Sequence, residues 1–487
     1  MQSLQAKRGT QDMRASQDDY FAPVKRAGMV ALSLLAVLGG ATAALAQEGP
    51  VRANNAPWVL NEDGETSKHM VVRQKEPPPP QLSGQQGTGE QTATRPRTKP
   101  KPPKDLGEPA RVNVHSAQRQ GVYTKVTTQY IPNYRVEFTE ALEKTLKARP
   151  KFDSEFPNGI RPKLGDVVDF GDDIGYSGGE CASGHGKGYW PPATFCADAN
   201  VAELYLPNKP EPTKDVCYTT LGSVGLFLNG TAVFNWSDAQ SYKNQEVWHN
   251  AAPVFEAYDF DICSGHAAAG LYHHHTYTPC LARFFKDDGK AHSPVWGFAA
   301  DGYPIHGPWQ GPNDLAQTCW KTRVYQAGSP TGCGKDGVRS CILVDNEDPA
   351  KGVKSVELAP PVGARLESLF SKNPLIANAG SYFEDFFFDQ ACAKRGGAAL
   401  DAYNGHSHGG LGYHYHLTVD GAMKPVFPYS FGPRYYGVLH DKSWTVCGGK
   451  PLDRSKMGPD GVKRGDASPP NAPKWLRVDA ARLADRF

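Results

Sequence analysis

Three Asn-Gly or Asp-Gly pairs limit how the central part of this chain can fold. The segment "VGLFLNGTAVFNW" (224–236) places Asn229-Gly230 between two apolar runs, and "VWGFAADGYPIHG" (295–307) does the same with Asp301-Gly302. A third pair, at 420–421, follows "GYHYHLTV". Such dipeptides adopt the positive φ angles of two-residue hairpin turns. Because long helical periodicity is absent around them, they predict an all-β or β-dominated domain of short, disulfide-stapled hairpins.

A few peripheral helices are expected beside these hairpins. The segment "TEALEKTLKA" (139–148) predicts a helix with Thr139 as its N-cap. Residues 362–372 and the C-terminal "PKWLRVDAARLADRF" are two further helix candidates. Pro304 lacks a backbone donor, so the second hairpin is expected to lie at a sheet edge or to contain a bulge.

The two ends of the chain differ in composition from its centre. Residues 1–46 have basic residues before an apolar, small-residue stretch, which predicts a signal peptide cleaved before Gln47, with an uncleaved anchor as the alternative. Residues 47–115 predict a disordered Pro-rich linker and 116–164 a short helix-containing lead-in. The β domain then covers 165–450, and 451–487 form a C-terminal tail. The mature protein is expected to be periplasmic or secreted, with no membrane span.

Cysteine usage is typical of an exported protein. All ten cysteines lie between Cys181 and Cys447, and none form close Cys-x-x-Cys pairs. An even count at wide spacing predicts a disulfide framework. Cys263 and Cys280 bracket one histidine cluster, and Cys392 and Cys447 bracket another, which makes these pairings attractive. The spacing leaves the connectivity open.

The charge balance argues against polyanionic partners. Lys and Arg total 53 against 51 Asp and Glu, a net charge of +2. A surface that binds nucleic acid carries a clear basic excess, and no nucleic-acid-binding signature is present. Nucleic acid is therefore not an expected partner.

Two distant segments share a histidine pattern. "DICSGHAAAGLYHHHT" (261–276) aligns with "DAYNGHSHGGLGYHYHLT" (401–418), with one residue inserted in the second. The alignment places three histidines of the first copy opposite three of the second: His266, His273 and His275 correspond to His406, His414 and His416. Such a match predicts an internal duplication or a pseudo-symmetric pair.

These segments, together with the two hairpin segments, resemble the family of secreted YHYH-domain proteins over about 165–450. The resemblance implies export, the domain boundaries and the shared histidines rather than an activity. The upstream copy departs from the family by reading Tyr-His-His-His, which adds His274 on the opposite strand face. Tyr403 stands where the family carries a cysteine, which puts one family-type disulfide in doubt.

The duplicated histidines have a spacing that suits a metal ion. Alternate side chains of a strand share one face, so each His-x-His pair can point at one ion. His266 and His406 are placed to supply a third ligand across a Gly-containing turn. Three imidazoles with an open fourth position suit Zn²⁺ or Cu²⁺. The alternative is a half-buried β-face in which His and Tyr only pack and pair across strands. Whether the copies form one site or two is left open.

Other residues near the duplicated pattern have two interpretations each. Tyr272, Tyr413 and Tyr415 can hydrogen-bond to the ligands or, less favourably, ligate the metal themselves. His292 and His306 either join the cluster or bond to loop carbonyls. Asp301 is interpreted as a turn residue rather than as a ligand or a general base. Asp259, Asp261 and Asp401 are interpreted as turn caps or as groups that orient imidazoles. His185, His274 and His408 are less favoured as metal ligands than these residues.

Three functions fit the sequence. The first is an exported metal-binding protein with Zn²⁺ or Cu²⁺ in the duplicated units. The second is a metal-dependent hydrolase or oxidase that uses an open coordination position. The third is a non-catalytic β domain with structural histidines that binds a small molecule or a surface polymer. No Gly-x-Ser-x-Gly elbow, His-Glu-x-x-His helix or phosphate-binding Gly loop is present.

Overall fold

The structure of the protein is a computed structural model. The described residues are 50–60, 114–149, 151–172, 174–177, 197, 201–244, 247–268, 271–339, 342–344, 352–354, 359–368 and 373–448. The expected signal peptide, most of the expected linker, His185 and the C-terminal tail lie outside them.

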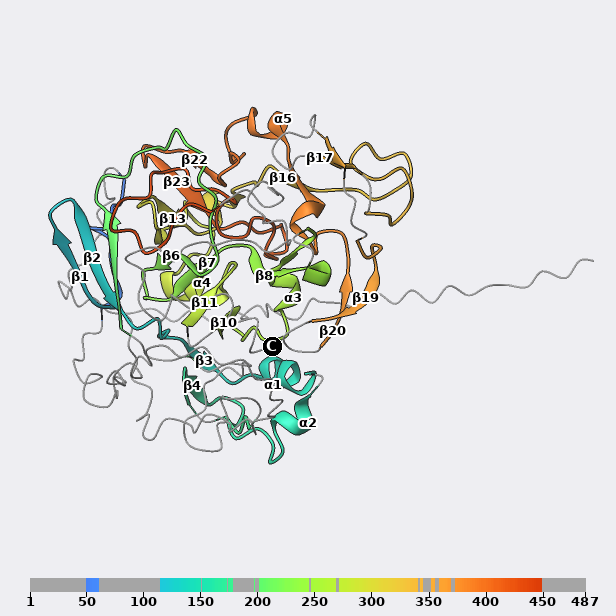
Figure 1. The fold of residues 1–487 in the computed structure, drawn as a ribbon. Coiled ribbons are helices and arrows are strands. Elements are labelled where there is room, and N and C mark those ends of the chain that lie inside the picture. The colour runs from blue at the N-terminus through green and yellow to red at the C-terminus, as the bar shows by residue number, and fades with distance from the viewer. Residues whose placement is uncertain are drawn as a thin grey trace, which may run out of the picture. The chain divides into compact units, whose positions relative to one another are not determined.

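Short strands dominate the described chain, and the helices between them are short (Figure 1). The strands that precede the large sheet are β1 (Val114–Gln120), β2 (Tyr123–Thr128), β3 (Arg135–Glu137), β4 (Val167–Asp169) and β5 (Ala202–Pro207). The large sheet contains β6 (Ser223–Phe227), β7 (Ala232–Phe234), β10 (Gly265–Ala268), β11 (Leu271–His274), β12 (Val295–Ala299), β13 (Pro304–His306), β22 (Gly405–Ser407) and β23 (Tyr413–His416). The remaining strands are β8 (Ser237–Ser241), β9 (His249–Ala251), β14 (Trp309–Gly311), β15 (Asp314–Leu315), β16 (Trp320–Thr322), β17 (Ile342–Val344), β18 (Gly352–Lys354), β19 (Ala364–Glu367), β20 (Pro374–Ala377) and β21 (Phe386–Phe388). The helices are α1 (Glu140–Lys147), α2 (Phe152–Glu155), α3 (Ala252–Phe255), α4 (Pro279–Phe285) and α5 (Gln390–Ala393), with 3₁₀ turns η3 (Tyr242–Asn244) and η4 (Phe383–Asp385).

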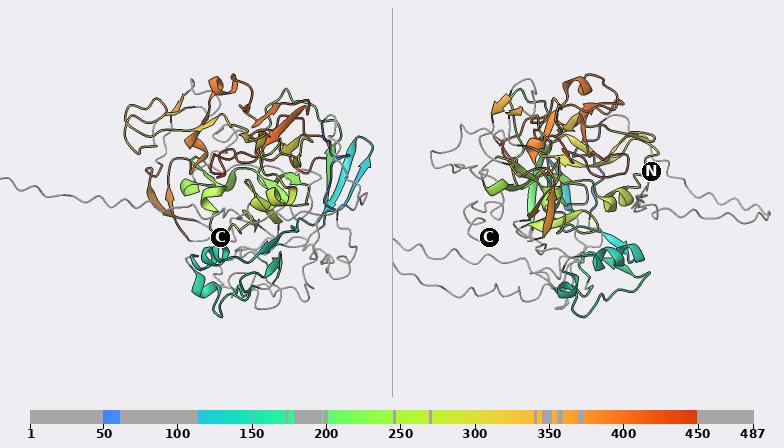
Figure 2. Two further views of the ribbon diagram at one scale, coloured as in Figure 1. Left: turned by 180° about the vertical axis from the view of Figure 1, so that it is seen from behind. Right: turned by 90° about the vertical axis from the view of Figure 1, so that its right-hand side faces the viewer.

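The eight-stranded sheet repeats one arrangement twice. Its strand order is β10-β11-β7-β6-β12-β13-β23-β22. In each half, an inner hairpin joins an outer hairpin through a parallel pair, β7 with β11 and β13 with β23. The two halves meet where β6 and β12 run antiparallel. Figure 1 shows β22 and β23 beside β13, and Figure 2 shows the same ribbon from behind and from its right-hand side. The fold is therefore β-dominated, as predicted, and it contains a pseudo-two-fold relation between β6 and β12.

The central junction depends on a pair of glycines. A Cβ on Gly225 would lie 2.9 Å from the Phe298 carbonyl oxygen, and one on Gly297 would lie 2.3 Å from that of Leu226. Each glycine stands four residues before its hairpin turn, at Asn229-Gly230 or Asp301-Gly302. The predicted hairpins β6-β7 and β12-β13 are both present. Two backbones therefore approach closely at equivalent places.

The chain also reverses at the third turn signal, Asp420-Gly421. Asp420 N donates to Lys424 O at 2.8 Å, and Val426 N donates to Thr418 O at 3.0 Å. The returning segment pairs through an isolated bridge between Val419 and Pro425. The predicted reversal is present, although it does not extend β23.

Pro304 tolerates its place inside the sheet because it is the first residue of β13. The expected edge position is wrong, since β13 pairs with both β12 and β23. The alternative expectation of a bulge is met by the register shift between Val295 and Gly297. The irregularity lies on the partner strand.

The helix candidates have different outcomes. Thr139 caps α1, and its side chain accepts a hydrogen bond from Leu142 N, as predicted. The helix expected at 362–372 is wrong, because Ala364–Glu367 form β19 and pair with β20. Hydrogen bonds to β20 override the weak helical pattern of this short segment. The C-terminal candidate lies outside the described residues.

Residues 50–60 pack on the domain, which a disordered linker over 47–115 does not account for. Ala53 is buried and Trp58 stacks near Phe298. Val59 N donates to Leu228 O at 2.9 Å, and its own carbonyl accepts from Val114 N at 3.2 Å. The apolar residues of this "APWVL" segment give it surface to bury against the domain.

Disulfides join segments that are distant in the sequence. Cys263 pairs with Cys280, as the bracketing suggested, whereas Cys392 pairs with Cys319 and Cys447 with Cys217. The expected Cys392–Cys447 pairing is therefore wrong, because bracketing a motif in sequence does not bring two cysteines within bonding distance.

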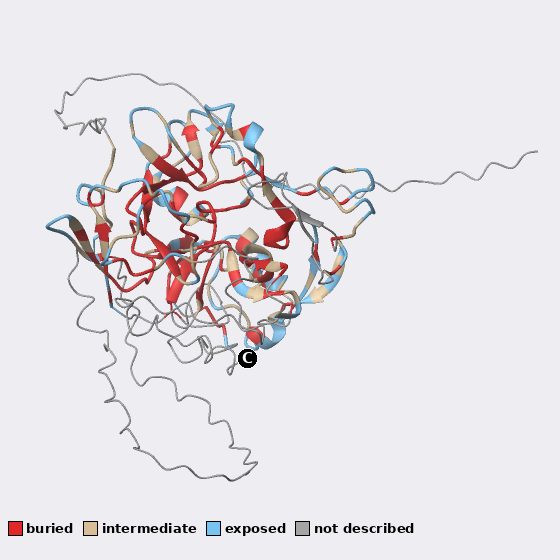
Figure 3. Ribbon diagram, turned by 45° about the horizontal axis from the view of Figure 1, so that its top comes forward, coloured by how far each residue is buried: buried red, intermediate tan, exposed pale blue. Residues whose placement is uncertain are grey.

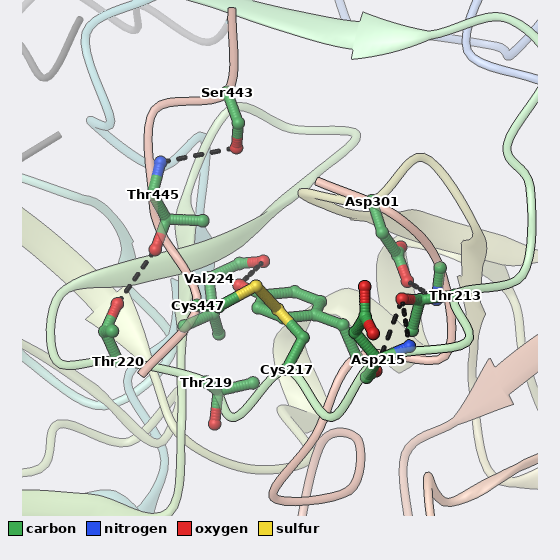
Figure 4. Close-up of a disulfide and its surroundings, with 12 residues drawn as sticks. Thr213, Asp215, Cys217, Thr219, Thr220, Val224, Asp301, Ser443, Thr445 and Cys447 are labelled. Carbon is green, nitrogen blue, oxygen red and sulfur yellow. Dashed lines mark hydrogen bonds between the residues drawn. A yellow bond between two sulfur atoms is a disulfide. The ribbon is translucent and has the colours of Figure 1, made fainter. Parts of the chain in front are cut away.

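The Cys217–Cys447 disulfide, drawn in Figure 4, joins the segment before the first half of the sheet to the segment after the second half. Beside it, the hydroxyls of Thr220 and Thr445 hydrogen-bond at 2.8 Å. Buried residues gather in the central strands (Figure 3). Within the described part of the chain, every helix is too short or too polar to cross a bilayer.

Candidate metal centres

The turn before each outer hairpin is built around one aspartate. Asp261 Oδ1 accepts from Cys263 N at 2.7 Å and Gly265 N at 3.0 Å. Asp401 Oδ1 accepts from Tyr403 N at 2.9 Å and Gly405 N at 3.1 Å. These bonds satisfy main-chain donors that the tight turn leaves unpaired. The same aspartate fixes the same turn in both halves.

The other carboxylate oxygen of each aspartate holds a tyrosine. Tyr272 OH donates to Asp261 Oδ2 at 2.5 Å, and Tyr413 OH donates to Asp401 Oδ2 at 2.9 Å. Each tyrosine lies over a glycine, because a Cβ on Gly265 or Gly405 would approach the phenol oxygen to 2.3 or 2.5 Å. The tyrosines therefore position the strands that carry the histidines, and their hydroxyls are engaged with carboxylates.

The first histidine group consists of Glu256, His266, His273 and His275, whose potential ligand atoms all lie within 4.8 Å of one another. His266 pairs with His273 across β10 and β11. His273 Nδ1 donates to Leu271 O at 2.9 Å and His275 Nδ1 donates to Asn235 O at 2.5 Å. A carbonyl can only accept, so Nδ1 carries the proton and Nε2 keeps its lone pair. The two Nε2 atoms are 3.0 Å apart.

Glu256 determines the charge of the first group. Its Oε2 lies 3.0 Å from His275 Nε2 and 3.4 Å from His266 Nε2. Burial alone would raise the pKa of Glu256, but the facing imidazoles of His266 and His275 lower it to about 2. Burial lowers the pKa of His266, and the Glu256 carboxylate more than offsets this, so the net shift is upward. Burial and the neighbouring imidazoles hold the pKa of His273 well below its usual range.

The second histidine group contains imidazoles alone: His292, His306, His406, His414 and His416. Each Nδ1 donates to a main-chain carbonyl: Ser293 O for both His292 and His306 at 2.8 Å, Gly397 O for His406 at 3.2 Å, Gly412 O for His414 at 2.9 Å, and Gly307 O for His416 at 2.6 Å. All five side chains are thus fixed in the tautomer that leaves Nε2 free to bind a cation.

The rings of the second group surround one small volume. His414 has ring-centre distances of 4.6 Å to His306, 5.0 Å to His406 and 5.0 Å to His416. His292 Nε2 lies 3.3 Å from His414 Nε2, and His292, His414 and His416 form a set of ligand atoms within 4.8 Å. The Nε2 atoms of His406 and His416 are buried with no hydrogen-bond partner. A buried nitrogen lone pair without a partner is costly, and a bound cation could take it.

Burial keeps the second group neutral. It lowers the pKa of His306 to about 3, of His406 to about 4 and of His414 to about 2, and neighbouring imidazoles add to the effect. The pKa of His416 is held well below its usual range for the same reasons. Neutral imidazoles are the form that binds Zn²⁺ or Cu²⁺.

The two groups differ in three members, because the second adds His292 and His306 and the first adds Glu256. His306 pairs with His416 in the parallel β13-β23 ladder. At the equivalent place in the first half, Phe234 stacks on His273 with ring centres 3.7 Å apart. Glu256 has no carboxylate counterpart in the second group. The first group is therefore sealed and acidic, and the second is purely imidazole.

The structure brings together all six predicted ligands in two separate sets. His292 and His306, which were lower-priority candidates in the sequence, belong to the second group. His408 stacks beside this group, with ring centres 5.7 Å from His292 and 5.3 Å from His406. His274 points elsewhere: its Nε2 meets Tyr134 OH at 2.6 Å.

Asp301 and Tyr415 form a contact between hairpins. Tyr415 OH donates to Asp301 Oδ2 at 2.5 Å and accepts from Tyr436 N at 2.7 Å. Asp301 also accepts from Gly437 N at 2.8 Å. It is a buried turn residue that anchors β23, and its carboxylate is not in either histidine group.

Sequence reasoning missed Glu256. It lies beyond α3, five residues before Asp261, and no local pattern links an acidic helix-end residue to a histidine hairpin. The correspondence of the hairpins at 224–236 and 295–307 was available as a signal, because each has a glycine four residues before its turn. That correspondence would have placed His306 opposite Phe234, next to the duplicated histidines.

The sheet and its two histidine groups define a duplicated β-hairpin domain with histidines in equivalent positions. A protein-family model described as "YHYH protein" matches residues 203–427, the stretch that contains both halves. The match over this stretch supports a YHYH-domain family protein. No curated protein matches the chain. No solved structure matches it either.

Proposed function

We propose that this is an exported protein that binds Zn²⁺ or Cu²⁺ at two centres, one in each half of the sheet. The observation that carries the proposal is the shared pinning of imidazoles, with Nδ1 bonded to a main-chain carbonyl and Nε2 directed into the group. Histidines with a purely structural role normally have hydrogen-bond partners for their buried nitrogens, whereas several buried Nε2 atoms in these groups have none. A histidine that binds a metal must keep its Nε2 lone pair free of other partners, because the metal takes that lone pair.

The donors suit these metals. The first group offers three imidazoles and a carboxylate, which is a complete tetrahedral set for Zn²⁺. The second offers up to five imidazoles, a donor number that Cu²⁺ accommodates and that its high affinity for nitrogen favours. The disulfides support an oxidising compartment, periplasmic or extracellular.

Metal analysis of untagged protein from the exported fraction tests the proposal. Two equivalents of metal are expected after incubation with Zn²⁺ or Cu²⁺ and dialysis. The pair His273→Ala and His275→Ala is expected to lose one equivalent, and the pair His414→Ala and His416→Ala the other. His115, an exposed histidine outside both groups, provides the matched control as His115→Ala. Protein that retains its native circular dichroism but takes up no metal would contradict the proposal and favour a surface-binding domain with structural histidines.

A metal-dependent hydrolase or oxidase is a second candidate, and one observation favours it. His292 and His406 are only half-buried, so the second group reaches the surface. An open metal position can activate water or dioxygen. Turnover of ester, phosphoester or phenol substrates by metal-loaded protein, lost in the His414→Ala and His416→Ala pair, would support it. No turnover at full metal occupancy would argue for binding alone.

A further inference from the structure

The two groups give a bound ion different net charges. In the first group, Glu256 lies against two imidazoles and offsets one positive charge of a divalent metal. Buried Asp259 adds negative potential nearby, because it interacts electrostatically with His266. The second group contains only imidazoles, which are neutral ligands. A divalent ion there would keep its full charge.

The main chain shows where the second half lacks its acidic ligand. Glu256 stands five residues before Asp261 in the first half, and Gly396 stands five residues before Asp401 in the second. The next residue, Gly397, supplies the carbonyl that holds His406 Nδ1, so this loop borders the second group. A Cβ on either glycine would meet nothing within 4 Å. The segment that supplies a carboxylate in the first half thus supplies only backbone in the second.

The second group is also the one that reaches solvent. His292, His406 and His408 are half-buried, and Gly396, Gly397, Gly409 and Gly410 beside them are exposed. In the first group, all three histidines are buried, with Phe234 stacked on His273 and Phe260 edge-on to His266. The Nε2 atoms of His406 and His416 in the second group are buried without a hydrogen-bond partner. An ion held there would be approachable from its rim.

We propose that the metal-loaded second group takes an exogenous carboxylate as a ligand, in the place that Glu256 fills in the first group. The inference rests on the proposed metal binding. An uncompensated cation in a partly dry site attracts an anion strongly, because low dielectric strengthens the interaction. The first centre satisfies that demand internally, and the second meets it with a carboxylate from a small molecule or a partner.

Azide binding to Cu²⁺-loaded protein tests the inference, with acetate as the competing carboxylate. One azide per chain is expected to give a charge-transfer absorption band, and acetate is expected to remove it in proportion to its concentration. The band is expected to disappear in His414→Ala and to persist in His115→Ala. His292→Glu, which adds an internal carboxylate, is expected to bind azide more weakly than the matched neutral variant His292→Gln.

The outcomes distinguish a failure of the carboxylate ligand from a failure of the proposed metal binding. Absence of bound copper in the elemental analysis would overturn the proposed function itself. Two bound coppers without an azide band, or a band that acetate does not affect, would overturn only the carboxylate ligand. A band that disappears in His273→Ala, while copper remains at the second group, would assign the anion to the wrong half and also overturn the inference.

Discussion

Gly405 and Tyr413 show how a single missing side chain shapes the second histidine group. The Tyr413 ring occupies the space above Gly405 and reaches Asp401, which in turn holds the turn that presents His406. Gly265, Tyr272 and Asp261 repeat the arrangement in the first half. The tyrosine of the Tyr-His-x-His pattern thus fills a structural role, and it positions the histidines that we propose as ligands.

Gly405→Ala is expected to destabilise the domain and weaken metal binding at the second group. Its Cβ would lie 2.5 Å from Tyr413 Oη and 2.6 Å from the His414 carbonyl oxygen, so β22 and β23 must separate. Overpacking of this kind costs about 1–3 kcal/mol of unfolding free energy. Urea denaturation and a Zn²⁺ titration measure the two effects.

Gly421→Ala is the matched control for that substitution. Nothing lies within 4 Å of its added Cβ, so we expect a change within about 0.5 kcal/mol. Equal stability of the two variants would show that the Tyr413 ring moves aside without cost, and would remove the packing argument for Gly405.

At the scale of elements, the β10-β11 hairpin lies within a short disulfide loop. Cys263 and Cys280 are separated by 17 residues, and the loop between them contains all three histidines of the first group. The second hairpin has no equivalent closure, because Tyr403 takes the place of Cys263. The first histidine group is therefore held by a covalent link as well as by the β10-β11 ladder.

Removing this link with Cys263→Ser and Cys280→Ser is expected to cost roughly 3 kcal/mol, because a loop of this length restricts the unfolded chain. The metal affinity of the first group should fall, since its hairpin gains freedom before binding. Guanidinium denaturation and metal titration of the double variant check both. Unchanged affinity for both metal equivalents would show that the ladder alone holds the hairpin.

Elements that depend on neighbouring residues were predicted correctly from the sequence, whereas features that depend on long-range contacts were not. The Asn229-Gly230 and Asp301-Gly302 turns are specified by neighbouring residues, and Thr139 caps its helix through its own hydroxyl. The Cys217–Cys447 bond joins residues 230 positions apart. Glu256 likewise reaches its histidines through tertiary packing. The repeat showed the three shared histidines of each group. The remaining member of the first group, Glu256, depends on a tertiary contact that no local pattern encodes.

At the scale of the whole molecule, both centres lie in one eight-stranded sheet, so metal binding should stabilise the entire domain. Free metal at 100 times its Kd stabilises the native state by about 2.7 kcal/mol for each site, provided that the unfolded chain does not bind it. Calorimetry is expected to show a melting temperature that rises with Zn²⁺ and falls after treatment with a chelator. A melting temperature indifferent to both would mean that neither histidine group binds the ion in the folded protein.

The antiparallel meeting of β6 with β12 also has the symmetry of a dimer. Two copies of one half, related by a two-fold axis, would form an isologous interface with Gly225 and Gly297 as the same residue seen from each side. In such a dimer, every substitution changes both centres together. Two halves in one chain are free of that constraint, so one histidine group can contain Glu256 and Phe234 while the other consists of imidazoles alone and reaches solvent.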